Sequence, residues 1–116
     1  MKRWRAAIAN SWNGILVCAR SEAAFREEIV ALILAIPLAM VLTDDPWKRV
    51  LLLLPLVLLL AIELLNTAIE KLCDRITKDF DVEIRRVKDM GSAAIGVTLI
   101  VTAAIWVFAV VDWVRM

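Results

Sequence analysis

Three polar residues share one face of an otherwise aliphatic helix near the middle of this sequence. Glu63, Asn66 and Glu70 stand at positions i, i+3 and i+7. Because an α-helix turns by about 100° per residue, their side chains lie within roughly 60° of one another around its axis. The run before them, VLLLLPLVLLLAI, is apolar, and a carboxylate in such a membrane helix is costly unless it faces protein, water or a cation. We therefore expect this polar stripe to have a chemical role.

Further candidate residues lie where the apolar segments reach their polar flanks. Glu22 and Glu28 precede the first apolar segment, Lys88 and Asp89 precede the third, and Arg3 lies near the N-terminus. Together they suit Mg²⁺ and phosphate chemistry, since Mg²⁺ prefers one or two carboxylates together with phosphate oxygens. Each also has a structural explanation: solvated or capped helix starts for the acids, a lipid-phosphate anchor for the arginine, and hydrogen bonding between helices for the stripe.

Other kinds of site are excluded or disfavoured by composition. The chain has no histidine and no cysteine pair with ligand spacing, so a zinc or haem site is not expected. Neither GxxxxGK[ST] nor GxGxxG occurs, which excludes the nucleotide-binding folds of soluble proteins. The net charge of +1 predicts no binding to nucleic acid. Cys18 and Cys73 fall on the predicted cytoplasmic side, where thiols stay reduced, so no disulfide is expected.

The elements that must position these residues are predicted to be membrane helices. Hydrophobic residues make up 62% of the 116 residues, against about 45–50% in a soluble domain. We expect an all-α membrane protein with one domain over 1–116, a surface helix at about 2–18 and spans at about 27–43, 48–70 and 90–111. Trp4, Ile8 and Trp12 recur on one face of the first helix, as in amphipathic helices that lie in the membrane interface.

The distribution of basic residues predicts the orientation of the chain. Of the 14 lysines and arginines, Lys48, Arg49 and Arg115 follow the first or third predicted span, and the others precede the first span or lie between the second and third. By the positive-inside rule the N-terminus is cytoplasmic and the C-terminus is outside. Ser21 is expected to cap the second helix, KDFDVEIRR to connect the second and third spans, and residues 88–92 to open the third.

Three segments together resemble a known family. ELLNTAIEKLCDR at 63–75, KDMGSAA at 88–94 and SEAAFREE at 21–28 closely resemble the small integral-membrane diacylglycerol kinases of bacteria. The resemblance implies a homotrimer, multi-pass in the bacterial inner membrane, that acts at the cytoplasmic face. There it would transfer the γ-phosphate of MgATP to the hydroxyl of 1,2-diacylglycerol and make phosphatidic acid, with Mg²⁺ as cofactor and membrane lipid as surroundings.

The resemblance also implies roles for individual residues. Glu63 would be the general base on the lipid hydroxyl, with Asn66 supporting it, and Glu22 and Glu70 would hold Mg²⁺. The residues implied in ATP binding are Arg3, Asn10, Glu22, Glu70, Lys88 and Asp89. Those implied near the lipid substrate are Arg3, Ser11, Trp12, Glu28, Glu63 and Ser92.

Other functions remain open at this point. A kinase of the same fold acts on undecaprenol in Gram-positive relatives, and it differs only in its lipid acceptor. A non-catalytic three-span assembly, or a proton-conducting subunit with Glu63 as its relay, would also explain a buried carboxylate. Neither of these would need Lys88, Asp89 or Arg3, so the basic residues favour a kinase.

Overall fold

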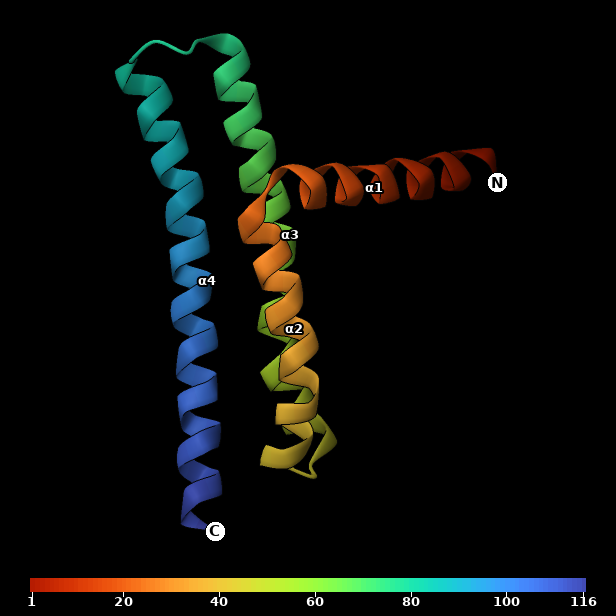
Figure 1. Ribbon diagram of the computed structural model, residues 1–116, viewed down its shortest axis with the longest axis vertical. Helices are drawn as coiled ribbons and strands as arrows, with labels where there is room; N and C mark the ends of the chain where they lie inside the picture. The colour runs from red at the N-terminus through yellow and green to blue at the C-terminus, as the bar shows by residue number, and fades with distance from the viewer.

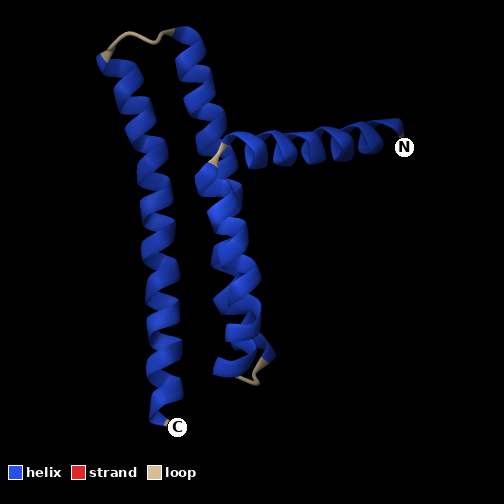
Figure 2. Cartoon of the chain, viewed as in Figure 1, coloured by secondary structure: helices blue, strands red, loops and turns tan.

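Four helices joined by short connections make up the chain in the computed structural model, which describes residues 1–116 (Figure 2). Helix α1 runs over Lys2–Ser21, α2 over Ala23–Leu42, α3 over Pro46–Ile76 and α4 over Val82–Arg115. The all-α prediction is confirmed. Helices α3 and α4 are each long and apolar enough to cross a membrane.

The first predicted span, at 27–43, corresponds to α2. Arg26, Glu27 and Glu28 lie in the first two turns of this helix, so its uncharged part is shorter than that of α3 or α4. It is not among the helices that meet the same length and composition test.

Helix α3 is central to the arrangement. It packs against α2 and against α4, whereas α2 and α4 contact each other little (Figure 1). Leu52 and Leu59 of α3 are buried, as are Ala35 and Ala39 of α2. The small alanine side chains let membrane helices approach closely. Only 13 of the 116 residues are buried. Most of the apolar surface of a single chain is therefore free for lipid or for further protein.

Helix α1 leaves the other three helices crosswise (Figure 1). Trp4, Ile8 and Trp12 are all exposed, so the apolar face predicted for this helix contacts no other part of the chain. The helix is attached near its C-terminal end, where buried Cys18 donates from Sγ to Oγ1 of Thr67 on α3 at 3.6 Å. It ends at Ser21, three residues beyond the predicted limit.

The corner between α1 and α2 is not built by Ser21, and that prediction is wrong. Ser21 is the last residue of α1, and Glu22, with extended backbone, stands before α2 without capping it through its side chain. Arg26 instead donates from Nη1 to the carbonyl oxygens of Ala19 and Arg20, at 2.7 and 3.2 Å. These carbonyls are at the end of α1 and have no partner within the helix, so a cation there stabilises the corner.

The connection between α3 and α4 is also shorter than predicted. Helix α3 ends at Ile76, six residues beyond the predicted span and just before the predicted connection at 78–86, but α4 already begins at Val82. Asp81 caps it by accepting from the backbone N–H groups of Glu83 and Ile84, at 2.9 and 3.1 Å, as N-cap aspartates do. Residues 82–86 are therefore helical, and 88–92 lie inside α4 and do not open it.

The turn between α2 and α3 is fixed by similar contacts. Asp45 caps α3 by accepting from the N–H of Trp47 at 3.0 Å, and Pro46 occupies the first helical position, where its missing N–H is not needed. Arg49 donates from Nε to the carbonyl of Thr43 at 2.9 Å, which satisfies the end of α2. Both ends of the α2–α3 turn are thus capped by side chains.

Pro55 interrupts the hydrogen bonding of α3 without breaking the helix. Its missing N–H leaves the carbonyl of Leu51 without a helical partner and opens the backbone locally. At the next residue, the carbonyl of Leu52 accepts from Nε1 of Trp106 on α4 at 3.0 Å. This bond fastens α4 to α3 where the proline weakens the ladder.

Candidate functional site

The polar stripe of α3 is buried in the chain. Glu63 is 7% exposed and Asn66 is 5% exposed, and Glu70, closer to the end of the helix, is half-buried. Neighbouring Thr67 is also buried. A carboxylate and an amide in this position need polar partners, because an uncompensated buried polar group is destabilising.

Asn66 links the stripe together. Its Nδ2 donates to Oε1 of Glu70 at 3.0 Å. Because an ionised carboxylate only accepts, the NH₂ group of Asn66 must face Glu70 and its Oδ1 must face the other way. That Oδ1 is buried without a hydrogen-bond partner.

Glu28 of α2 faces Glu63 across the contact between α2 and α3. The two carboxylates lie close enough to act on each other electrostatically, and Glu22 and Glu70 add further negative charge near Glu63. Oε2 of Glu28 is buried without a partner. The predicted residues Glu22, Glu28, Glu63 and Glu70 are therefore brought into one acidic region, which we call the acidic cluster.

The acidic cluster does not form a ready-made metal cage. No three histidine, cysteine, aspartate or glutamate side chains of the chain converge as metal ligands do. Glu22 and Glu70 are both half-buried and offer hard oxygen donors, which is the ligand type that Mg²⁺ takes. Two such carboxylates suit a cation whose remaining ligands are phosphate oxygens and water.

Charged residues gather where α3 ends and α4 begins. Lys88 of α4 donates from Nζ to Oδ1 of Asp74 on α3 at 2.7 Å, and Arg85 pairs with Asp89 at 3.3 Å. A cavity of about 280 Å³ opens beside them. The residues that line it are Thr77, Lys78, Asp79, Phe80, Asp81, Ile84, Arg85 and Lys88. Its lining has three cationic side chains, which are groups that bind phosphate, and two carboxylates.

Some predicted site residues are not brought to the acidic cluster. Arg3, Asn10, Ser11 and Trp12 lie on the exposed part of α1, away from the attachment at Cys18. Ser92 lies on α4 with its side chain exposed. Within a single chain, the structure joins the predicted residues of α2 and α3 and leaves those of α1 apart.

The structure also adds residues that the sequence did not single out for the site. Thr67 attaches α1 next to Asn66 through Cys18. Gly91 of α4 lies directly against the amide of Asn66. Small residues in membrane helices generally mark places where two helices approach closely. The glycine at position 91 could therefore have predicted this contact from the sequence.

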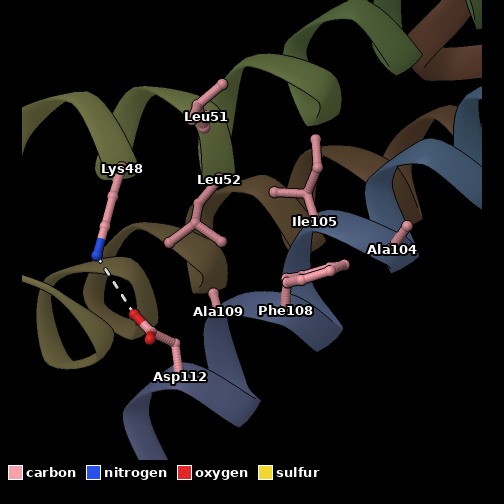
Figure 3. Close-up of a pocket in the computed structure, with 8 residues that line it drawn as sticks. All are labelled: Lys48, Leu51, Leu52, Ala104, Ile105, Phe108, Ala109 and Asp112. Atoms are coloured by element: carbon pink, nitrogen blue, oxygen red, sulfur yellow. Dashed lines mark hydrogen bonds and ion pairs between the residues drawn. The ribbon is translucent and has the colours of Figure 1, made fainter. Parts of the chain in front are cut away.

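A larger groove lies elsewhere. It has a volume of about 400 Å³ and lies between α3 and α4 near their other ends, where Lys48 pairs with Asp112 at 3.3 Å (Figure 3). Figure 3 shows Leu52, Ile105 and Phe108 among the side chains that line it. Apart from the ion pair its lining is aliphatic or aromatic, so the groove offers no group for phosphoryl transfer.

Comparison with known proteins gives a consistent result. A family model described as prokaryotic diacylglycerol kinase matches residues 9–110. The protein of Escherichia coli called diacylglycerol kinase is 42% identical over 100 residues, which are 86% of this chain and 82% of that protein. Proteins of the same name from Pseudomonas aeruginosa and Helicobacter pylori are 38% and 37% identical, over 91% and 90% of this chain and 86% and 82% of their own lengths.

Because α1 is attached beside Asn66 through Cys18, we predict that this thiol reacts slowly with maleimides. Burial raises the pKa of the Cys18 thiol above its usual value, and only the thiolate reacts with maleimides. In folded protein, Cys18 should react several-fold more slowly than a cysteine placed at exposed Val17 in a Cys18→Ala background. The reaction rate of Cys18 should rise with pH, and the midpoint of this rise should lie at a higher pH than for the cysteine at position 17. The reason is that the thiolate forms only as the pH passes the raised pKa. Equal rates and midpoints at 17 and 18 would contradict the attachment of α1.

Proposed function

The chain belongs to the prokaryotic diacylglycerol kinase family, and from this premise we propose that it transfers the γ-phosphate of MgATP to the hydroxyl of 1,2-diacylglycerol. It is a lipid kinase and a membrane protein, and phosphatidic acid is the product we propose. The observation that carries the proposal is the burial of Glu63, which faces Glu28, together with the burial of Asn66. Family membership sets aside a purely structural or proton-conducting role. The relatives compared above are all named for diacylglycerol, which favours that acceptor over undecaprenol.

We propose Glu63 as the general base for the lipid hydroxyl. Its burial against α2 keeps water from competing with the lipid, which matters because water is the alternative acceptor for a phosphoryl group. Asn66 lies one turn away and orients the stripe through its bond to Glu70.

Glu22 and Glu70 are proposed to hold Mg²⁺ on the ATP phosphates. When bound, Mg²⁺ supplies neutralisation of phosphate charge. Glu70 lies seven residues beyond Glu63, which on a helix is about 10 Å, so one helix can serve both the acceptor and the phosphates. Lys88, and Asp89 with it, would bind the nucleotide near the cavity at the start of α4. Lys88 would exchange Asp74 for phosphate, since exposed ion pairs are weak.

The proposed assembly is a homotrimer in the bacterial inner membrane, with α2 as a third span and α1 on the cytoplasmic surface. The apolar surface that one chain leaves exposed supports further protein contacts. Assembly would also give α1 a partner for its exposed face. Arg3, Asn10, Ser11 and Trp12 would then complete a site as ligands of nucleotide or lipid.

Two substitutions separate the roles of base and metal ligand. Glu63→Gln should lower turnover by about 10²–10⁴-fold, the usual contribution of a general base, with MgATP affinity nearly unchanged. Glu70→Gln should lower activity and also raise the Mg²⁺ requirement. Glu27→Gln, which changes an exposed residue of α2, is the matched control and should change neither. Transfer of labelled phosphate to diacylglycerol measures both effects. Near-parental turnover of Glu63→Gln would remove the carboxylate from the reaction.

Labelling of intact cells tests the proposed orientation. Cys18 and Cys73 are buried and would first be replaced by alanine. An impermeant maleimide should then label Asp44→Cys, in the turn between α2 and α3, from outside. Asp79→Cys, in the loop between α3 and α4, should react only after lysis. Both positions are exposed, so accessibility differs only by membrane side. The reverse pattern would put the acidic cluster on the side without ATP.

A further inference from the structure

Gly91 differs from the other two glycines in what surrounds it. A Cβ added at Gly91 would overlap Oδ1 of Asn66 and lie 3.3 Å from its Cγ. A Cβ added at Gly14 or at Gly96 would meet nothing within 4 Å. Gly91 is itself buried on α4. It is therefore the point where the backbone of α4 approaches the polar stripe of α3.

The amide of Asn66 has no freedom to turn its oxygen elsewhere. Nδ2 donates to the carboxylate of Glu70, which accepts only, so Oδ1 must face α4. There it is buried without a conventional donor, and the space it occupies is the space that a side chain at position 91 would take. The hydrogen that glycine carries in place of Cβ faces this oxygen, a weak polar contact that needs no extra room.

We propose that Gly91 is a positioning residue for phosphoryl transfer. Because Gly91 has no side chain, the amide of Asn66 fits against α4 in the orientation that donates to Glu70. The inference rests on the proposed function, in which Glu70 holds Mg²⁺ on ATP. A fixed amide fixes one carboxylate oxygen of Glu70 by a charge-assisted hydrogen bond. Gly91 thus acts on the reaction through Asn66 and Glu70, without touching substrate.

A methyl group at position 91 can be accommodated in two ways, and both disturb the proposed nucleotide site. Either the amide of Asn66 rotates and loses Glu70, or α4 moves away from α3. Movement of α4 would carry Lys88 with it, since Lys88 lies three residues earlier on the same helix. Asn66 is closely packed and cannot absorb the overlap as a flexible surface side chain would.

Comparison of Gly91→Ala with Gly96→Ala tests the inference. In Gly91→Ala, kcat/KM for MgATP should fall by about 10–10²-fold, as expected for a misplacement of about 1 Å. The Mg²⁺ concentration for half-maximal rate should rise, while KM for diacylglycerol stays the same. Gly96→Ala makes the same change five residues further along α4 and should leave all three parental. Equal behaviour of the two variants, or a change confined to KM for diacylglycerol, would overturn the inference.

A measurement without activity keeps the inference separate from the proposed function. The side-chain NH₂ protons of Asn66, followed by NMR in micelles, should be protected from exchange in the parent and in Gly96→Ala and unprotected in Gly91→Ala. If the parent transfers no phosphate, the proposed function fails, and the NH₂ signals still decide what Gly91 does to Asn66. Unchanged protection in Gly91→Ala would overturn the inference even in an active kinase.

A double variant covers the case in which Gly91→Ala does not fold. With Asn66→Ala also present, the added methyl group no longer meets the amide, so the two changes should not be additive. Gly91→Ala/Asn66→Ala should fold as well as Asn66→Ala alone and show the same Mg²⁺ dependence. If the double variant folds less well than Asn66→Ala, the collision lies elsewhere and the inference is wrong.

Discussion

Helix α3 carries a carboxylate and an amide through an apolar stretch, and it can do so only because α2 and α4 cover them. Glu63 and Asn66 are almost fully buried, although a buried polar group without partners is among the most costly features of a membrane helix. The cover is polar on each side: Glu28 faces Glu63 from α2, and the backbone at Gly91 faces Asn66 from α4. The close fit of three helices is therefore a condition for the site, and the rest of the chain serves to maintain it.

The contacts that maintain this fit lie at the ends of the helices and at one proline. Arg49 and Asp45 fix the turn between α2 and α3, and Asp81 starts α4 close to the end of α3. Trp106 fastens α4 to α3 beside Pro55. The capping side chains satisfy backbone groups at the helix ends, and Trp106 satisfies the carbonyl of Leu52 within the apolar part of α3, where lipid offers no partner. The length of α3 then carries the polar stripe from the buried region to the charged end of the helix pair.

The sequence predicted what depends on periodicity and composition. The all-α class and a shared face for Glu63, Asn66 and Glu70 both follow from apolar runs and helical spacing. The predictions failed at helix ends that are fixed by a single polar side chain. Arg26, which the sequence did not single out, holds the corner that Ser21 was expected to make. Asp81 starts α4 within a segment that was predicted to be a connection. Contacts between helices, such as Lys88 with Asp74 and Gly91 with Asn66, leave no periodic signal, because they depend on how two helices are placed in register.

The central claim is that the acidic cluster serves phosphate transfer to diacylglycerol. Because the family fixes the type of reaction, the most direct test is which lipid accepts the phosphate. Purified protein in mixed micelles would receive γ-labelled MgATP together with equal amounts of diacylglycerol and undecaprenol. We predict label in phosphatidic acid, with little in undecaprenyl phosphate and none without Mg²⁺. Label in undecaprenyl phosphate alone, or in neither lipid while the protein remains folded, would contradict the account.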